Sequence, residues 1–352
     1  MSSAHADIRK HTFVFKSDRG VDYAGDCYLP AAAESTYAQA PILLYWHGGG
    51  LVSGTREWDD FSAGWLFDAC LKAGIAVISL DYTLLGPQSA HNVVDDVCAT
   101  VAYLKNELQK SLPADSPSLD TDRIAVAGSS AGGYVAYVAA AVLPGAFKAL
   151  VSIYGAGGDL LTDWYLQEKT DSFLPGIPLL GDVEPCRKIL EQSKDTTPPT
   201  VSFPFANRAD PRTLLLLYML QTGTMLDALT GKEGVAAQLR AVPSADRPKL
   251  ARELGPEVTD VLPQLSALEQ FPPSLLLHGD ADTLVKVHES RALAERLQQA
   301  GVDATLREVE GGDHVFDLAD RWAKGPGGKD SELTRRKEEA LESVLPWLLE
   351  RI

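Results

Sequence analysis

The chain has 352 residues, 45% of them hydrophobic, and a formal net charge of −16. This length suits one large domain with an insertion, or two small domains, and the apolar content is enough for a large core. The acidic balance argues against a nucleic-acid-binding protein and against a protein held on anionic membranes by charge. We therefore expect no nucleic-acid partner and no membrane partner.

The cysteines and the N-terminal residues bear on the compartment. Cys27, Cys70, Cys98 and Cys186 show no metal or redox spacing, so we expect reduced thiols. Residues 1–10 carry no apolar segment of the kind found in secretory signals, and no uninterrupted apolar stretch is long enough to span a bilayer. These features predict a cytoplasmic protein, and they leave open whether it forms a homodimer.

The first part of the chain predicts strands that alternate with helices. Apolar and alternating runs predict strands at residues 10–18, 21–29, 42–46 and 75–80. Helical spacing of apolar residues predicts helices at residues 56–73 and 91–110. Buried strands that alternate with helices require parallel pairing, with crossover helices on both faces of the sheet.

The strongest motif follows the next apolar run, Arg123–Gly128. The sequence Gly128-Ser129-Ser130-Ala131-Gly132 leads into a helix of small residues, residues 133–142. Gly-x-Ser-x-Gly between a strand and a helix is typical of a nucleophile elbow, where a strained turn exposes the serine. Small residues on both sides are needed because the backbone is crowded there. The motif predicts Ser130 as the nucleophile.

A glycine-rich segment comes directly after the strand at residues 42–46. It reads His47-Gly48-Gly49-Gly50. Glycine allows backbone N–H groups to approach the point where a tetrahedral oxyanion forms, so the segment is a candidate oxyanion loop.

Residues 155–263 interrupt the alternation of strands and helices. They contain many prolines, scattered aromatic residues and a strongly apolar helix predicted at residues 211–229. We interpret them as an inserted cap over the catalytic edge, whose apolar residues partly pack together and partly form a hydrophobic acyl or ring pocket.

The last part of the chain supplies an acid and a base. After a predicted strand at residues 274–278, three carboxylates compete for the acid role: Asp280, Asp282 and, further away, Glu289. A helix at residues 287–300 and a strand at 303–309 precede His314, which lies in a Gly-Gly-Asp-His loop before a final helix at 331–351. Because carboxyl ends of parallel strands share one edge, these groups can gather beside Ser130.

Together these motifs resemble the hormone-sensitive-lipase-like carboxylesterases of the α/β-hydrolase superfamily, which carry an HGGG oxyanion loop. The resemblance runs from about Pro41 to Ile352, apart from the middle insertion. It implies an α/β fold with a mostly parallel eight-stranded sheet flanked by helices. Residues 1–154 and 264–352 would form the hydrolase core, and residues 155–263 the helical cap.

The resemblance also assigns roles to residues. Its Gly-x-x-Asp loop points to Asp282, so the implied triad is Ser130, Asp282 and His314, and Asp280 becomes a loop-capping residue. The implied oxyanion donors are the backbone amides of Gly49, Gly50 and Ala131, with His47 in a structural role. The implied reaction is cleavage of carboxylic esters of a small hydrophobic substrate through an acyl-enzyme, with no cofactor and no metal.

The chain departs from the family's sequence pattern at two positions, and three alternative functions stay open. The family often has Asp-Tyr-Arg where this chain has Thr83, and many relatives carry Asp where it has Ser129. The same serine could instead serve a biosynthetic lactonase, thioesterase or acyltransferase. A non-catalytic ligand-binding homologue commonly lacks the base, so His314 argues against that reading. A peptidase of the prolyl-oligopeptidase kind usually carries a large extra domain, for which this chain is too short.

Overall fold

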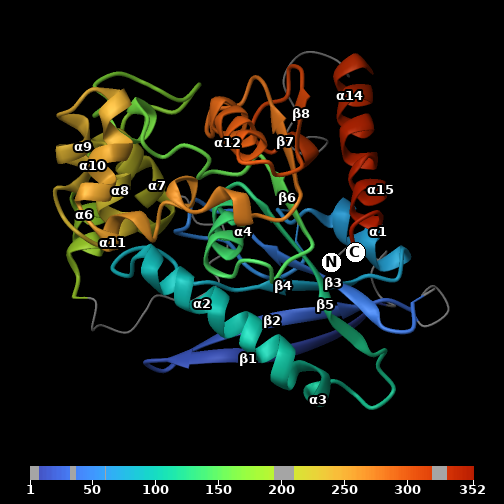
Figure 1. Cartoon of the computed structure of the whole chain (residues 1–352). Coiled ribbons are helices and arrows are strands. Elements are labelled where there is room, and N and C mark those ends of the chain that lie inside the picture. The colour runs from blue at the N-terminus through green and yellow to red at the C-terminus, as the bar shows by residue number, and fades with distance from the viewer. Residues whose placement is uncertain (1–7, 32–36, 60, 194–209, 319–330) are drawn as a thin grey trace.

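The computed structural model describes residues 8–31, 37–59, 61–193, 210–318 and 331–352. Outside these ranges lie residues 1–7, from the N-terminal segment that bears on secretion, and residues 194–209 of the predicted cap. A central sheet of eight strands runs through the molecule in the order β1-β2-β4-β3-β5-β6-β7-β8 (Figure 1). The strands are β1 (Arg9–Asp18), β2 (Val21–Leu29), β3 (Ala40–Trp46), β4 (Ala76–Leu80), β5 (Leu119–Ser129), β6 (Ala149–Ile153), β7 (Ser274–Gly279) and β8 (Ala304–Val309).

The sheet is mostly parallel. β1 pairs antiparallel with β2, and β2 pairs antiparallel with β4. All other neighbours, from β4 through β3, β5, β6 and β7 to β8, pair parallel. The predicted eight-stranded α/β sheet is therefore confirmed, with each predicted strand found within a few residues of its expected bounds.

Helices cover both faces of the sheet because its central strands are apolar on both sides. Along β3, Ile42 and Leu44 join a core cluster on one face, whereas Leu43 and Tyr45 join the cluster on the other. The first face is covered by α2 (Ala90–Tyr103), α4 (Ala131–Val142) and α12 (His288–Gln299). The second is covered by α1 (Gly64–Lys72), α14 (Ser331–Glu342) and α15 (Val344–Leu349).

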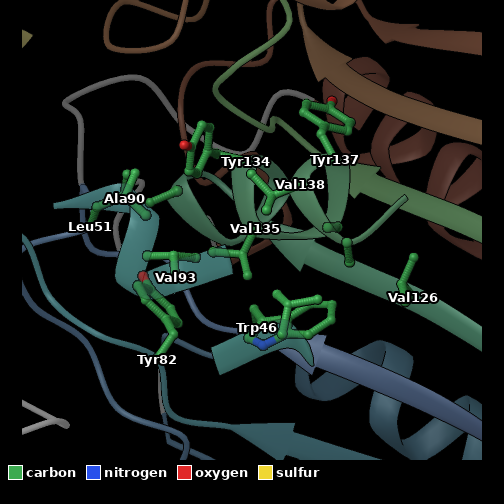
Figure 2. Close-up of a cluster of buried hydrophobic side chains, with 14 of the residues drawn as sticks. Trp46, Leu51, Tyr82, Ala90, Val93, Val126, Tyr134, Val135, Tyr137 and Val138 are labelled. Carbon is green, nitrogen blue, oxygen red and sulfur yellow. The ribbon is translucent and has the colours of Figure 1, made fainter. Parts of the chain in front are cut away.

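Helix α4 is buried on almost every side, and Figure 2 shows its apolar side chains packed between the sheet and the neighbouring segments. Val135 lies between Val93 of α2 and Trp46 of β3 in this view, and all three belong to one core cluster with Val126 and Val138. The small residues of α4 allow close packing on the sheet, and its first residue follows directly on Ser130. The burial of α4 therefore fixes the position of the predicted nucleophile.

Several predicted helices differ from those observed. The helix predicted from residue 56 begins only at Gly64, because the Asp59 side chain accepts a hydrogen bond from the Phe61 amide and forms a local turn first. The helix predicted at residues 91–110 changes to a π-helical turn at Leu104–Leu108 before α3 (Gln109–Ser111). The final helix is divided at Ser343, where Pro346 lacks the N–H group that would continue it.

The described parts of residues 155–263, namely 155–193 and 210–263, contain helices beside the end of the sheet (Figure 1). They are α5 (Asp163–Leu166), α6 (Glu184–Glu191), α7 (Pro211–Thr222), α8 (Met225–Thr230), α9 (Val235–Arg240), α10 (Arg247–Glu253) and α11 (Pro256–Thr259). The helix predicted at 211–229 is thus two helices, because Gly223 adopts a left-handed conformation with φ of 65°. The division into a hydrolase core and a cap at residues 155–263 stays a prediction.

A buried arginine ties α7 to the body of the molecule. The Arg212 guanidinium donates hydrogen bonds to the backbone carbonyls of Val52, Leu85 and Gly86. Burial lowers the pKa of Arg212 to about 10, and the nearby Asp210 opposes that shift.

Among the described helices, none is both long and apolar enough to cross a membrane.

Candidate active site

Ser130 lies at a strained turn between β5 and α4. Its φ is 53° and its ψ is −119°, a conformation that non-glycine residues rarely adopt. A Cβ added at Gly128 would lie 2.0 Å from the Gly132 carbonyl oxygen, and one added at Gly132 would lie 1.9 Å from the Trp46 carbonyl oxygen. Both glycines of the Gly-x-Ser-x-Gly motif are therefore required by close backbone contact.

The structure brings Ser130, His314 and Asp282 into one hydrogen-bonded chain. The His314 Nε2 atom lies 3.0 Å from the Ser130 Oγ atom, and His314 Nδ1 lies 2.7 Å from the Asp282 Oδ2 atom. A carboxylate accepts, so Nδ1 carries the proton and Nε2 is free to accept from the serine hydroxyl. Ser130 is only 8% exposed. This is the arrangement required for a general base beside a nucleophile.

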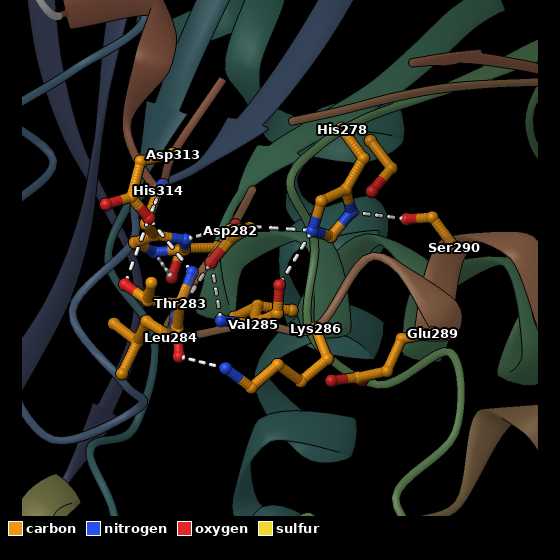
Figure 3. Close-up of polar contacts among 12 residues, drawn as sticks. His278, Asp282, Thr283, Leu284, Val285, Lys286, Glu289, Ser290, Asp313 and His314 are labelled. Atoms are coloured by element: carbon orange, nitrogen blue, oxygen red, sulfur yellow. Dashed lines mark hydrogen bonds and ion pairs between the residues drawn. The ribbon is translucent and has the colours of Figure 1, made fainter. Parts of the chain in front are cut away.

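The Asp282 carboxylate is held by several donors (Figure 3). Its Oδ1 atom accepts from the amides of Leu284, at 2.9 Å, and Val285, at 2.8 Å. Burial opposes the charge, but the neighbouring imidazole of His314 and the hydrogen bonds from His278 and His314 outweigh it and hold the pKa of Asp282 well below its usual range. Asp282 can therefore stay ionised beside His314.

The two competing acids have other partners. Asp280 accepts from the Gly311 amide at 2.6 Å, which fits the loop-capping role expected for it. Glu289 is fully buried on α12, accepts from the Gly157 amide at 2.9 Å and binds the Tyr165 hydroxyl at 2.5 Å. Burial raises the pKa of Glu289 to about 8. Of the three carboxylates, Asp282 is the one bonded to His314.

The glycine loop after β3 lies directly against the nucleophile. A Cβ added at Gly48 would lie 3.3 Å from the Ser130 Cβ atom. Within the described residues, the backbone N–H groups of Gly49, Gly50 and Ala131 have no hydrogen-bond acceptor. Three unoccupied donors beside a serine hydroxyl form a surface that can receive a developing oxyanion.

His47 supports this loop from inside the molecule. Its ring stacks on Tyr82 at a centroid distance of 4.4 Å, and its Nδ1 atom donates to the Gly48 carbonyl at 2.7 Å. Burial lowers the pKa of His47 to about 4, so the ring is neutral near pH 7. The Tyr82 hydroxyl also donates to the His47 carbonyl, at 3.1 Å. These contacts agree with a structural role for His47.

Both departures from the family pattern have local partners. The Ser129 hydroxyl lies 2.7 Å from the Tyr45 hydroxyl, so a neutral pair of hydroxyls stands next to the nucleophile. The Thr83 amide donates to the Asp96 carboxylate at 2.6 Å, and Lys16 binds the same carboxylate at 2.6 Å. The loop after β4 is therefore held by Asp96.

Sequence reasoning missed His278, which is fully buried at the end of β7. Its Nε2 atom lies 3.2 Å from the Asp282 Oδ2 atom and 2.8 Å from the Val285 carbonyl oxygen. Its Nδ1 atom lies 2.7 Å from the Ser290 hydroxyl. The sequence signal that could have identified it is a histidine near the end of a buried strand, four residues before the predicted acid.

An apolar pocket opens at Ser130. Its walls combine the glycine loop and α4 with α7, α8 and the loops after β6 and β7, and Ser130 lies among carbon-rich neighbours. The lining residues are Gly50, Leu51, Ser130, Ala131, Tyr134, Ala156, Leu160, Tyr165, Leu216, Leu220, Met225, Leu229, Leu284 and Val285. Within the described part of the chain, no cluster of three or more His, Cys, Asp or Glu side chains could hold a metal ion.

Comparison with known families agrees with this geometry. Residues 251–318 match the family described as "alpha/beta hydrolase fold", and residues 26–152 match the family described as BD-FAE. The chain has the α/β-hydrolase fold. These matches, together with a relative named as a carboxylesterase, agree with a hydrolase of the carboxylesterase type.

Two kinds of relative resemble this hydrolase. A polyketide synthase of Aspergillus calidoustus, named "Non-reducing polyketide synthase ausA", is 29% identical over 88% of the chain, which spans only 13% of that protein. A protein of a Phoma species named "Probable carboxylesterase M8" is 26% identical over 82% of the chain and 83% of its own length. The chain thus spans a small part of the synthases and most of the esterase-like relative.

Solved structures share the fold of the hydrolase. A structure described as "Bacterial Heroin Esterase" aligns with a TM-score of 0.60 and 18% identity over 99% of this chain and 86% of that chain. One of two fungal esterases from Rhizomucor miehei aligns with a TM-score of 0.59 and 20% identity, over 99% of this chain and 84% of that chain. At this identity the likeness concerns the fold alone.

Proposed function

We propose that the hydrolase cleaves carboxylic esters with an apolar acyl group through an acyl-enzyme on Ser130. The observation that carries the proposal is the chain of hydrogen bonds from Ser130 through His314 to Asp282 at the wall of an apolar pocket. A serine hydroxyl is a weak nucleophile on its own, and a neutral imidazole within 3.0 Å is the base it needs.

In the proposed reaction, His314 Nε2 takes the hydroxyl proton while Ser130 Oγ attacks the ester carbonyl. The amides of Gly49, Gly50 and Ala131 stabilise the oxyanion, and Asp282 stabilises the charged imidazole. His314 then gives its proton to the leaving alcohol, which departs and leaves the acyl group on Ser130. In the second half, His314 activates water, which releases the carboxylic acid and restores the serine.

The acyl group is proposed to lie in the pocket between α4, α7 and α8. Two tyrosines line it, but the Tyr134 hydroxyl donates to the Val261 carbonyl at 2.9 Å and the Tyr165 hydroxyl binds Glu289. The protons of both hydroxyls are therefore engaged with the protein, and the surface of the pocket is almost wholly apolar, so a hydroxyl group on the acyl chain would lose its water without gaining a comparable partner. That loss costs about 1–3 kcal/mol, so an octanoyl ester should be cleaved roughly tenfold faster than its 3-hydroxy analogue.

A second candidate is acyl transfer or thioester cleavage by the same serine. It is favoured by the similarity of most of this chain to a segment of polyketide synthases. The two candidates differ in substrate and acceptor. Comparing p-nitrophenyl butyrate with the matched butyryl thioester, each with water alone and with an added alcohol, separates them by the preferred leaving group and by the product, acid or new ester.

The test of the proposed function is ester hydrolysis by the wild-type protein and by Ser130→Ala. We expect turnover of p-nitrophenyl butyrate by the wild type, and loss of turnover in a variant that keeps its thermal unfolding temperature. Full activity in Ser130→Ala would refute the assignment. A folded wild-type protein that binds apolar esters without turnover would indicate the non-catalytic alternative.

A further inference from the structure

A second histidine contacts the carboxylate that orients the proposed base. Asp282 Oδ2 is shared by His314 Nδ1 at 2.7 Å and His278 Nε2 at 3.2 Å, and Figure 3 shows the two rings on opposite sides of it. His278 is not itself one of the residues that line the pocket, and it contacts the pocket wall through the Val285 carbonyl. Any effect it has on the reaction must therefore pass through Asp282 or through the loop that follows it.

The partners of His278 determine which ring nitrogen carries its proton. The Val285 carbonyl and the Asp282 carboxylate can only accept, and both face Nε2. Nε2 must therefore be protonated. In the neutral ring Nδ1 is then an acceptor, and the Ser290 hydroxyl, 2.7 Å away, is the donor that fills it. The two acceptors at Nε2 thus select the tautomer that presents an N–H group to Asp282, and the Ser290 hydroxyl stabilises it by donating to Nδ1.

The same ring holds the loop that carries the acid. Val285 donates its amide to Asp282 Oδ1, and its carbonyl accepts from His278 Nε2. Asp282, Val285 and His278 thus form a closed ring of hydrogen bonds at the carboxyl end of β7 (Figure 3). Rotation of the carboxylate away from His314 would break contacts on both of its oxygen atoms.

We propose that His278, held by Ser290, is a positioning residue that fixes Asp282 in the orientation which binds His314. The proposal rests on the proposed function. When Asp282 orients His314, a larger fraction of enzyme–substrate complexes has the geometry needed for proton transfer. Loss of the His278 contact should therefore lower kcat more than it changes KM. Losing one hydrogen bond to a charged group predicts a fall in kcat of roughly tenfold to a hundredfold.

The test compares two replacements of similar size. His278→Gln keeps an amide N–H that can reach Asp282 and Val285, whereas His278→Leu has no donor. We expect His278→Leu to lower kcat by roughly tenfold or more with KM within about threefold, and His278→Gln to recover most of that loss. Ser290→Ala should lower kcat by a smaller factor, because the ring loses the contact that holds Nδ1 while the two acceptors still keep the proton on Nε2.

Leu276→Ala is the matched control, since Leu276 is fully buried two residues earlier on β7 and contributes only to the core. It should lower the unfolding temperature about as much as His278→Leu and leave kcat unchanged well below that temperature. Equal kcat losses in the Gln and Leu variants, or an unchanged kcat in His278→Leu, would overturn the positioning role. An inactive wild-type protein would instead refute the proposed function, so the two failures are distinct.

Discussion

Gly49→Ala tests the proposed oxyanion loop through a backbone clash. Gly49 has a φ of 111°, and a Cβ added there would lie 2.0 Å from the Ser53 carbonyl oxygen and 2.5 Å from its carbonyl carbon. Ser53 also donates its own amide to the Gly49 carbonyl at 3.0 Å, so the clash falls inside a closed turn. The loop must retreat by about 1 Å or more, a displacement that can cost roughly a hundredfold in rate.

That displacement moves the amides of Gly49 and Gly50 away from the proposed oxyanion. Loss of one such donor typically costs about 2.7–4 kcal/mol, or roughly 100- to 1,000-fold in kcat. We therefore expect Gly49→Ala to lower kcat for p-nitrophenyl butyrate by at least about a hundredfold, with a smaller change in KM.

Gly20→Ala provides the control for backbone strain. Gly20 also has a positive φ, of 82°, but an added Cβ there meets nothing within 4 Å, and the residue lies in the turn between β1 and β2. This variant should keep wild-type kcat. If Gly49→Ala were folded and kept kcat within about threefold of the wild type, the reasoning on the oxyanion loop would be wrong.

Three further predictions concern stability and thiol chemistry. The pKa of Glu289 is about 8 in the folded protein and near 4.5 when unfolded, so its contribution to stability is complete below pH 4.5 and declines as the pH rises toward 8. The free energy of unfolding of Glu289→Gln should therefore rise relative to that of the wild type by up to about 1.4 kcal/mol per pH unit between pH 4.5 and 8. Denaturant unfolding at a series of pH values checks this, and a difference between the two proteins that does not change with pH would contradict it. Arg212→Met should lower the free energy of unfolding by about 2 kcal/mol or more, since three backbone carbonyls lose a charged donor; denaturant titration with no loss would exclude the anchoring role. A thiol reagent should modify the exposed Cys98 rapidly in the native protein, and Cys27 and Cys70 only after unfolding. Cys27 and Cys70 are buried, and burial raises the pKa of each thiol to about 12. Rapid modification of all three thiols in the native protein would contradict the burial of Cys27 and Cys70.

Much of the fold could be predicted because its signals are local. The buried strands are short apolar runs bounded by glycine or polar residues, and the elbow has a strand on one side and a small-residue helix on the other. The breaks within helices were harder, since they depend on partners elsewhere. Gly223 interrupts a continuous apolar pattern only because its backbone is left-handed, and an added Cβ there would meet the Leu166 carbonyl oxygen at 2.4 Å.

The candidate site was predictable to the extent that it follows from motifs at strand ends. Ser130, Asp282 and His314 each lie in a short signature loop, and strand order brings these loops to one edge. His278 escaped notice because its role depends on a contact with Asp282 across a folded loop and on the Ser290 hydroxyl from α12. No spacing rule encodes a hydrogen bond between a strand and a helix twelve residues later.

Covalent labelling of the nucleophile tests the central claim most directly. The wild-type protein is treated with a serine-directed alkyl phosphonate, its peptides are mapped by mass spectrometry, and ester hydrolysis is measured on the same sample. The account predicts one adduct, on Ser130, with activity lost in proportion to its formation. An adduct on a different serine, or full hydrolytic activity after Ser130 is completely labelled, would contradict it.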